Sequence, residues 1–500
     1  MSDLLDIKSF GGLNCSPAAD GGDCAIAVNL DDTFAPALRT ACGFTETVLS
    51  DEGTFQGHLV ECGQTVMSVF DDTLHVGTFR FPLEPLGVPR KFLRISRKEV
   101  LILPDVYLYS YRYRECEPLD KRHTSKGTAF VENNMLVVRL ENRSGHAFHD
   151  RVYLEGAGYT YYDPETNPTS GLLYFRVVEY EKNGDGCTLT LQSVTNGDSI
   201  GHTDVDENGN LTVRQVYPRM DDVMIFRNRL WCVGGATLSA SKLGDYLNFT
   251  DFAGLSTDSF SLELEELLTT VSHFGERVVF MSRGHLYELF GDRPTNYQVS
   301  AAKTGGCSHP DSVCTAGGYL IYADDTNLYR YGGGDPQIIS GGLDLPAWSS
   351  VFGVSGGETC YLGLDTALYR YRPKRNTFYA VGRNATLGVT QENTPFFYYN
   401  KGYFCPNRER TGSVHYRSGW ICLDRTGRAA PKELLLRIDG ATDAVHLVTR
   451  DGTAHRLTAL DDRGDGLLRL PLPADLTHRV FAVDVCGHGD FCLHRIIVRG

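Results

Sequence analysis

The sequence predicts an all-β protein: a β-propeller with an inserted small β-barrel and a β-rich C-terminal segment. A Leu-Tyr motif recurs at Leu286, Leu328 and Leu368, which are 42 and then 40 residues apart. Each copy follows an apolar stretch and a polar turn, and a period near forty residues is typical of one four-stranded propeller blade. The 53 glycines, 26 tyrosines and 25 phenylalanines of the chain suit strands that are joined by many turns.

The repeat also predicts how the sheets pack. A single blade cannot bury both faces of its own sheet, so neighbouring blades must cover it, and ring closure removes the exposed sheet ends. If each repeat is one blade, three motif tyrosines occupy equivalent positions on successive sheets: Tyr287, Tyr329 and Tyr369.

The blade rhythm divides the chain into four parts. Residues 1–115 are expected to hold an N-terminal closing strand and the first blades, and residues 217–411 the later blades. Between them, residues 116–216 break the rhythm with strand-like stretches such as Cys187–Leu191, which predict the inserted small barrel. Residues 412–500 contain clear strands and would form either the last blade or a separate sandwich.

The net charge of the chain limits the kinds of molecule that it can bind tightly. With 48 basic and 62 acidic side chains, its net charge is −14, and such a surface repels nucleic acid and will not hold a duplex tightly. This charge suits a conduit through which DNA slides, although simple solubility explains it as well. The N-terminus lacks a basic and apolar leader, and no window approaches eighteen apolar residues. We therefore expect neither a signal peptide nor a membrane span.

The fourteen cysteines are scattered and include no CxxC pair, which argues against zinc-ribbon and thioredoxin-like sites. We expect them to be small buried side chains in a reducing cytosol. Near the C-terminus, Cys492 lies between His488 and His494, but strand alternation favours a buried Cys492 over a nucleophile.

The best metal candidates are Asp204, Asp206 and Asn208, which with Gly209 copy the first half of a calcium-binding loop. Position 12 of such a loop is Gln215 and not the bidentate glutamate that calcium needs. Because Asn-Gly is also a strong hairpin signal, a plain turn is the favoured interpretation.

Adjacent carboxylates occur at three places: Asp221-Asp222, Asp324-Asp325 and Asp461-Asp462. Propeller glycosidases use such groups as acid and nucleophile, but nothing in the sequence brings the pairs together. Solvated turn residues are the favoured interpretation. The sequence thus predicts no catalytic residues and no cofactor.

One segment has a distinctive local pattern. Residues 226–235 read F-R-N-R-L-W-C-V-G-G, and residues 239–249 read S-A-S-K-L-G-D-Y-L-N-F. This order predicts a strand, a Gly-Gly turn, a second strand, and a Gly-Asp turn that leads into an aromatic anchor. The segment resembles the signature of bacteriophage tail proteins built on a β-propeller, the group that includes tail nozzle, tubular tail B and tail-stabilising proteins. The matching positions are Asn228, Arg229, Trp231, Gly234, Gly235, Gly244, Asp245, Tyr246 and Phe249.

Both ends of the chain carry looser parts of the same resemblance. The N-terminal part resembles the opening of these proteins from Gly11-Gly12 onward, except that Ala41-Cys42 stands where Arg-Pro is usual. In such proteins an extended opening strand often closes the propeller by pairing with the last blade. Gly487-His488-Gly489-Asp490 resembles their closing turn.

The resemblance implies a structural virion component and not an enzyme. It implies a homo-oligomeric ring, a hexamer, below the portal and adaptor in the virion tail, made in the bacterial host cytoplasm. Its bore would pass DNA during ejection without specific binding, and its rim would dock tail fibres and other tail proteins. The signature residues would pack between blades, with Trp231, Tyr246 and Phe249 as the main buried area. The alternative is a tail-tip propeller that binds a receptor or a glycan, or that acts on carbohydrate.

Overall fold

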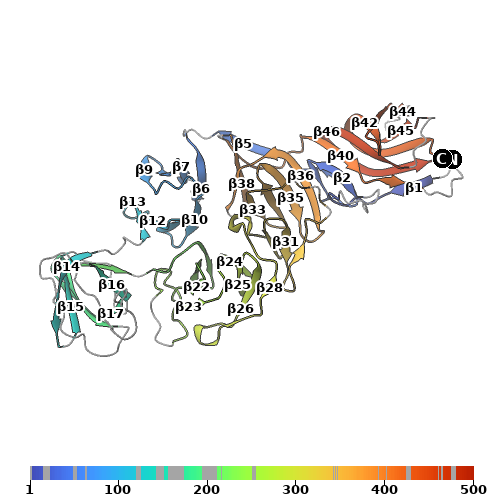
Figure 1. Cartoon of the computed structure of the whole chain (residues 1–500). Helices are drawn as coiled ribbons and strands as arrows, with labels where there is room; N and C mark the ends of the chain where they lie inside the picture. Colours follow the sequence, from blue (N-terminus) through green and yellow to red (C-terminus); the bar gives the residue numbers. More distant parts are fainter. Residues whose placement is uncertain are drawn as a thin grey trace. The chain divides into compact units, whose positions relative to one another are not determined.

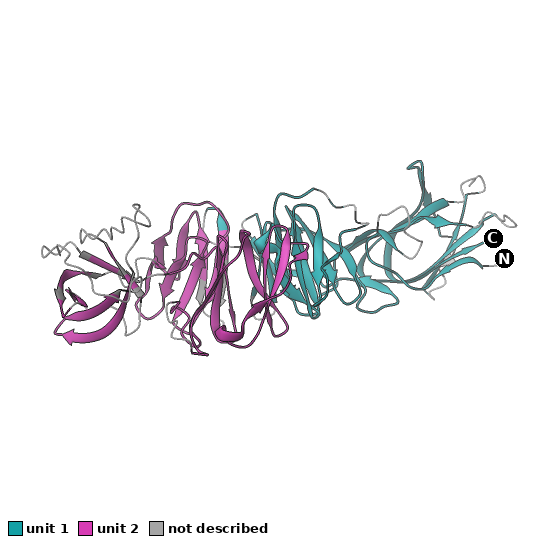
Figure 2. Cartoon of the chain, turned by 60° about the horizontal axis from the view of Figure 1, so that its bottom comes forward, with its two compact units in different colours: residues 1–55, 307–500 teal, residues 56–306 magenta. Residues whose placement is uncertain are grey.

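The computed structural model divides the chain into two compact units, residues 1–55 with 307–500, and residues 56–306 (Figure 2). It describes residues 3–14, 23–48, 53–61, 65–119, 125–133, 135–141, 151–155, 174–193, 211–215, 217–249, 255–341, 343, 345, 347–391, 394–400, 402–423, 430–459, 461–462, 466–473 and 480–500. Most of these residues lie in strands, with only short 3-10 turns such as Pro294–Asn296 and Pro310–Ser312. No helix in these ranges is long and apolar enough to cross a membrane.

Residues 56–306 contain four antiparallel sheets built from consecutive strands (Figure 1). The first is β6 (Phe55–Glu61), β7 (Thr65–Phe70), β8 (Thr73–Val76) and β9 (Phe79–Pro82). The second is β10 (Lys91–Arg94), β11 (Glu99–Leu103), β12 (Tyr107–Ser110) and β13 (Glu115–Pro118). The third is β20 (Asp222–Phe226), β21 (Arg229–Gly234), β22 (Thr237–Ala240) and β23 (Phe260–Glu263). The fourth is β24 (Leu268–Phe274), β25 (Arg277–Ser282), β26 (His285–Phe290) and β27 (Gln298–Val299), with β28 (Lys303–Thr304) also on β26.

The other unit contains three more sheets of this kind. One is β29 (Cys314–Ala316), β30 (Tyr319–Ala323), β31 (Leu328–Tyr331) and β32 (Gln337–Ile338). The next is β33 (Val351–Gly356), β34 (Thr359–Leu364), β35 (Ala367–Arg372) and β36 (Thr377–Asn384). The last is β37 (Leu387–Gln391), β38 (Thr394–Tyr399), β39 (Gly402–Pro406) and β5 (Phe44–Val48). These sheets are propeller blades, and the predicted all-β propeller is confirmed.

The forty-residue repeat has the expected structural meaning. Tyr287, Tyr329 and Tyr369 lie on β26, β31 and β35, the third strand of three successive sheets. Each pairs with an apolar residue of the second strand, and Tyr287 and Tyr329 stack on Phe280 and Tyr322 with ring centroids 5.3 Å apart in both cases. The repeated Leu-Tyr motif therefore marks one register position of the blade.

The inserted barrel interrupts the blades between β13 and β20. It closes in the order β14 (Ser125–Glu132), β15 (Met135–Leu140), β18 (Gly186–Ser193), β17 (Tyr174–Asn183), β16 (Arg151–Glu155) and β19 (Leu211–Gln215). Alternate residues of its strands, such as Leu136 and Val138 on β15, or Leu189 and Leu191 on β18, fill one apolar core. Closure leaves these strands without an exposed sheet edge.

The N-terminal residues contribute to two sheets. β5 pairs antiparallel with β39, so that Phe44 faces Pro406 and Val48 faces Gly402, and the last blade is completed by an N-terminal strand. The first strand, β1 (Asp3–Ile7), pairs with the end of the chain, where Ile7 faces Ile496. Both pairings tie N-terminal residues to late ones, but only β5 joins a blade, whereas β1 joins the C-terminal segment.

Residues 413–499 do not complete a blade within the described part of the chain. Their strands are β40 (Ser413–Ser418), β41 (Ile421–Cys422), β42 (Glu433–Thr449), β43 (Ala454–Leu457), β44 (Asp461–Asp462), β45 (Leu467–Pro471) and β46 (Val480–Arg499). These strands pair with one another, with β1, and with β2 (Cys24–Val28) and β4 (Leu38–Thr40), which itself pairs with β3 (Leu30–Asp31). β2 also pairs with β36, where Val28 faces Ala380, so these strands continue the sheet that contains β33–β36.

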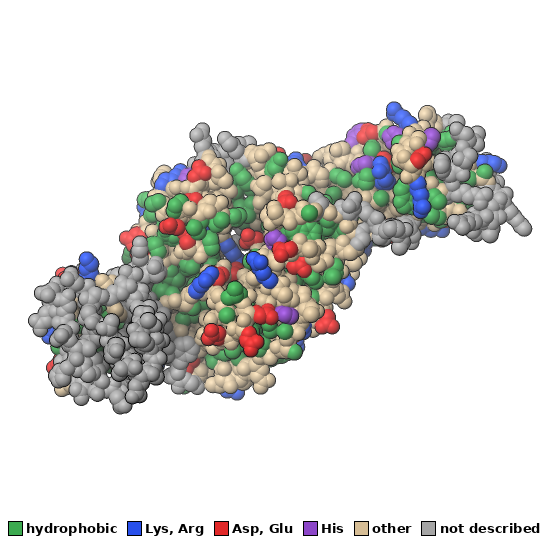
Figure 3. All heavy atoms as spheres, viewed as in Figure 1, with side chains coloured by type: hydrophobic (Ala, Val, Ile, Leu, Met, Phe, Trp, Pro, Cys, Tyr) green, Lys and Arg blue, Asp and Glu red, His purple; other side chains and the backbone are tan. Residues whose placement is uncertain are grey.

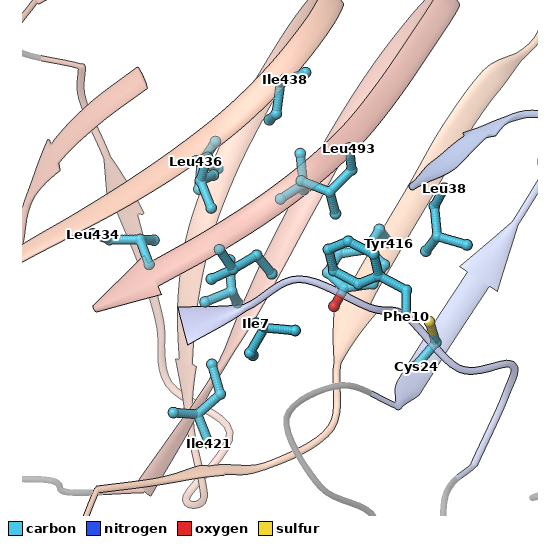
Figure 4. Close-up of a cluster of buried hydrophobic side chains, with 14 of the residues drawn as sticks. Ile7, Phe10, Cys24, Leu38, Tyr416, Ile421, Leu434, Leu436, Ile438 and Leu493 are labelled. Carbon is cyan, nitrogen blue, oxygen red and sulfur yellow. The ribbon is translucent and has the colours of Figure 1, made fainter. Parts of the chain in front are cut away.

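The C-terminal segment shares an apolar core with N-terminal residues and with Tyr379 of β36. Ile7 and Phe10 from the N-terminus point toward Tyr416, Leu436 and Leu493 (Figure 4). The core residues alternate along their strands, so the opposite face of the same strands carries the polar side chains.

Candidate functional site

The tail-protein signature lies on the third blade, β20–β23, and begins with a tight hairpin. Arg227 and Asn228 join β20 to β21, and their φ angles of 50° and 56° lie in the left-handed region. A type I′ hairpin turn requires positive φ at both central residues, and asparagine adopts this conformation more readily than most side chains. Asn228 is therefore a turn residue with an exposed side chain.

Arg229 follows the turn and is buried, with 3% of its surface exposed. Its Nη1 donates hydrogen bonds to the carbonyl oxygens of Ser241, at 2.7 Å, and Asp258, and its Nη2 donates to that of Ser256 at 3.0 Å. Burial lowers the pKa of Arg229 below its usual value. The planar guanidinium thus holds the loop after β22 through main-chain acceptors, an arrangement that suits a structural role.

Alternate residues of β21 face two different blades. Trp231 and Val233 belong to an apolar cluster with Val271 and Phe280 of the fourth blade. On the other side, Leu230 and Cys232 pack in a cluster with residues of the second blade, including Leu101 and Leu108. The Trp231 Nε1 donates to the carbonyl oxygen of Phe226 at 3.2 Å, so its polar atom is also satisfied. β21 is therefore covered on both faces, as a propeller blade must be.

Gly234 is the last residue of β21 and Gly235 follows it. A larger side chain is excluded at each position for a different physical reason. A Cβ on Gly234 would lie 2.2 Å from the carbonyl oxygen of Arg219, which no side chain tolerates. Gly235 has a φ of 60° and occupies the first central position of a two-residue turn with Ala236, as in a type II′ hairpin. The turn is therefore Gly235-Ala236, and Gly234 is needed for a close backbone approach.

The Gly-Asp turn docks the aromatic anchor against the first hairpin. Gly244, with a φ of 79°, donates its N–H to the carbonyl oxygen of Asn228 at 2.8 Å. Asp245 is exposed, and its carbonyl oxygen accepts from the N–H of Asn248 at 3.3 Å. Phe249 is 7% exposed and lies in the cluster shared with the second blade, whereas Tyr246 is half-buried at its edge. Trp231 and Phe249 thus contribute to two separate cores and not to one.

The Asp221-Asp222 pair was expected to consist of solvated turn residues, and this expectation is wrong for Asp222. Asp222 is 3% exposed, and its Oδ2 accepts hydrogen bonds from Thr270 Oγ1 at 2.6 Å and from the Val271 N–H at 3.1 Å. Its Oδ1 contacts Lys91 Nζ. Asp222 therefore connects β20 to β10 and β24, the first strands of the flanking blades, a long-range role that adjacent sequence does not reveal. Asp221 is exposed as expected.

The second pair does form a turn. Asp324 Oδ1 accepts from the N–H groups of Thr326 at 2.6 Å and Asn327 at 2.5 Å, and Oδ2 accepts from Tyr329 Oη at 2.7 Å. Burial alone would raise the pKa of Asp324, but these hydrogen bonds lower it below its usual value. Asp325 is exposed, with its Oδ1 3.5 Å from His309 Nε2. A carboxylate that is kept ionised by its own turn is a poor general acid.

The structure describes only some of the remaining predicted positions. The calcium candidates Asp204, Asp206 and Asn208 lie outside the described residues, as do the side chains of Asp461 and Asp462. Cys492 is half-buried and not fully buried as expected.

The histidines that flank Cys492 are engaged by aspartates. His488 Nδ1 lies 2.7 Å from Asp443 Oδ1, and His494 Nε2 lies 2.7 Å from Asp439 Oδ2. Both partners come from β42, and neither contact makes a pair with the thiol of Cys492.

Sequence reasoning missed one polar cluster on the C-terminal segment. His415, Asp484 and Cys486 come from β40 and β46, and their ligand atoms lie within 4.8 Å of one another. The only sequence signal is the alternation of polar residues, His-Tyr-Arg at 415–417 and Asp-Val-Cys at 484–486. The strand register that joins them could not be read from the sequence.

Comparison with protein-family models and with curated protein sequences finds no match. Among solved structures, this chain is similar to a streptogramin B lyase, with 8% identity over 73% of this chain and 98% of that one and a TM-score of 0.36. It is similar to an exo-β-1,3-galactanase from Phanerochaete chrysosporium, with 9% identity over 55% and 95% of the two chains and a TM-score of 0.23. It is also similar to Hsv2 from Kluyveromyces lactis, with 8% identity over 63% and 93% of the chains and a TM-score of 0.27. At these values the similarities carry no argument about function.

Proposed function

We propose that this protein is a structural component of a bacteriophage tail, a nozzle or hub-type ring subunit that forms part of the DNA ejection conduit. The proposal depends on the resemblance at residues 226–249. One observation supports it most directly: the described side chains of the signature serve packing, turns and main-chain hydrogen bonds. Arg229 and Trp231, the two of these side chains best suited to bind a ligand at a surface, are both almost fully buried.

Two further features fit this role. An N-terminal strand completes the last blade, and a closed barrel interrupts the blade series, both of which the resemblance implies. The net charge of −14 disfavours tight binding of DNA, which a passage for DNA needs. The neighbours in this proposal are identical subunits in a ring of six, the portal and adaptor, and tail fibres.

The test is the mass of the purified full chain in solution, measured by light scattering, with and without a portal–adaptor assembly from the same virion. We expect the assembly to gain the mass of about six chains, and negative-stain images to show an added ring. A chain that stays free of the assembly under all conditions contradicts the proposal. Release of reducing sugar from cell-wall material, lost in the Asp324→Asn variant, would instead support a carbohydrate-active propeller.

A further inference from the structure

The polar face of the C-terminal segment brings together side chains from three neighbouring strands. In the register of these strands, His415 of β40 faces Cys486 of β46, and Arg417 faces Asp484. His446 of β42 faces Asp484 from the other side. The intervening residues, Val414, Tyr416, Val445, Leu447, Val483 and Val485, all lie in the apolar core.

Because side chains alternate, the five polar residues therefore share the opposite face of the sheet. Figure 3 shows histidine, acidic and basic side chains on the visible face of the C-terminal segment.

The ligand atoms of this group lie close enough together to surround one metal ion after small adjustments. The ligand atoms of His415, Asp484 and Cys486 all lie within 4.8 Å of one another, and His415 Nε2 is 3.0 Å from Asp484 Oδ2. His446 Nδ1 lies 3.9 Å from Asp484 Oδ1. Ligands around a tetrahedral ion with bonds of about 2.0–2.3 Å are roughly 3.3–3.8 Å apart, so small side-chain rotations suffice.

The Asp484 carboxylate is already buried and held in place without a bound ion. The Asp484 side chain is only 5% exposed, whereas about a third of the His415 and His446 side chains remains accessible. Arg417 contacts Asp484 Oδ2 through Nε and Nη2, both at 2.6 Å. Arg417 thereby orients the carboxylate, as hydrogen-bond partners of metal ligands commonly do. When Cys486 is a thiolate, it and the Asp484 carboxylate carry two negative charges. Arg417 carries one positive charge, so the group keeps a net negative charge that attracts a cation.

The kinds of ligand atom select the class of ion. Calcium and magnesium prefer sets made of oxygen atoms, whereas imidazole nitrogen and thiolate sulfur favour zinc and related transition metals. We propose that His415, Asp484 and Cys486, with His446 as a fourth ligand, form a Zn²⁺ site on the outer face of this sheet. Binding replaces the thiol proton of Cys486, which is released to solvent. The ion would join β40, β42 and β46 and so stabilise the C-terminal segment.

The experiment uses Co²⁺ as a spectroscopic probe of the full chain, followed by displacement with Zn²⁺. We expect one equivalent of Co²⁺ to give a thiolate charge-transfer band and visible bands of tetrahedral intensity, which Zn²⁺ abolishes. Cys486→Ser should remove the charge-transfer band and weaken binding at least about tenfold, and His415→Ala should weaken it similarly. Zn²⁺ should raise the melting temperature of the wild type and leave that of Cys486→Ser unchanged.

Two matched controls come from the same sheet. Cys422 is an exposed cysteine on β41, and His488 is a histidine that contacts Asp443. Cys422→Ser and His488→Ala should leave the Co²⁺ spectrum intact. Absence of a charge-transfer band in the wild type, or a band that survives Cys486→Ser and disappears in Cys422→Ser, overturns the site.

His446→Ala tests the fourth ligand separately. Weaker Co²⁺ binding in this variant supports the assignment. Unchanged affinity overturns His446 as a ligand and leaves a site of three protein ligands. The melting temperatures of metal-free Cys486→Ser and wild type should agree, which separates loss of the metal from loss of the fold.

Discussion

Leu230 and Trp231 are neighbours in the chain but belong to different hydrophobic cores. This division follows from strand alternation, because β21 is covered by a blade on each face. Each of these side chains therefore stabilises a different contact between blades, and the loss of one should leave the other in place.

Trp231→Ala tests this packing directly. Trp231 is 2% exposed, and its removal should lower the free energy of unfolding by about 3–5 kcal/mol, since the cavity can close only in part. Chemical denaturation of the full chain measures the change. Tyr113→Ala removes an aromatic side chain that is 63% exposed and should change stability by less than about 0.5 kcal/mol. Equal effects of the two substitutions would refute the packing role.

Gly234→Ala tests the close backbone approach at the end of β21. The added Cβ would lie 2.2 Å from the carbonyl oxygen of Arg219, so the backbone must shift, and we expect a lower melting temperature. Gly284→Ala is the control, because a Cβ at Gly284 meets nothing within 4 Å and this glycine has no positive φ. A Gly234→Ala variant as stable as Gly284→Ala would contradict the structure.

The strands of the chain differ in how they find their partners. Most blades form from consecutive hairpins, so their pairing is local. β1 and β5 instead pair with strands several hundred residues later, and these contacts carry a larger loop-closure cost that burial and ion pairs must offset. Arg495 supports β1 in this way, since its Nε donates to Asp6 Oδ1 at 2.6 Å.

This ion pair should make the attachment of β1 dependent on pH. Hydrogen bonding by Arg495 lowers the pKa of Asp6 from its usual value to about 2 in the folded chain. The pair therefore stabilises the fold fully above the unfolded pKa of about 4, and the contribution is lost as the pH falls through about 2.

The comparison is Asp6→Asn against wild type by chemical denaturation between pH 7 and pH 2.5. Because the pair is partly exposed, we expect a difference of no more than about 1 kcal/mol at pH 7 that shrinks in acid. A difference that grows as the pH falls would contradict the assignment.

At the scale of the whole molecule, two proposed properties can be tested: assembly of the chain into a ring, and metal binding on the C-terminal segment. The two are independent. A chain that joins a portal assembly without binding Co²⁺, or that binds Co²⁺ and stays a monomer, would separate them cleanly.

Features that depend on short stretches of chain could be predicted from the amino-acid sequence. The spacing of Leu286, Leu328 and Leu368 predicted the blades, because each blade is one continuous run of hairpins. The turn at Gly244 was also predicted, because a positive φ limits which residues can stand there, whereas the expected Gly-Gly turn lies one residue later, at Gly235-Ala236.

The pairing of distant strands became evident in the folded chain. The attachment of β5 to β39, the burial of Asp222 between flanking blades, and the meeting of His415 with Cys486 all depend on register between separate segments. A strand pattern shows which side chains share a face, but it does not name the strand beside it. That is why the sequence predicted the blades and missed the polar cluster.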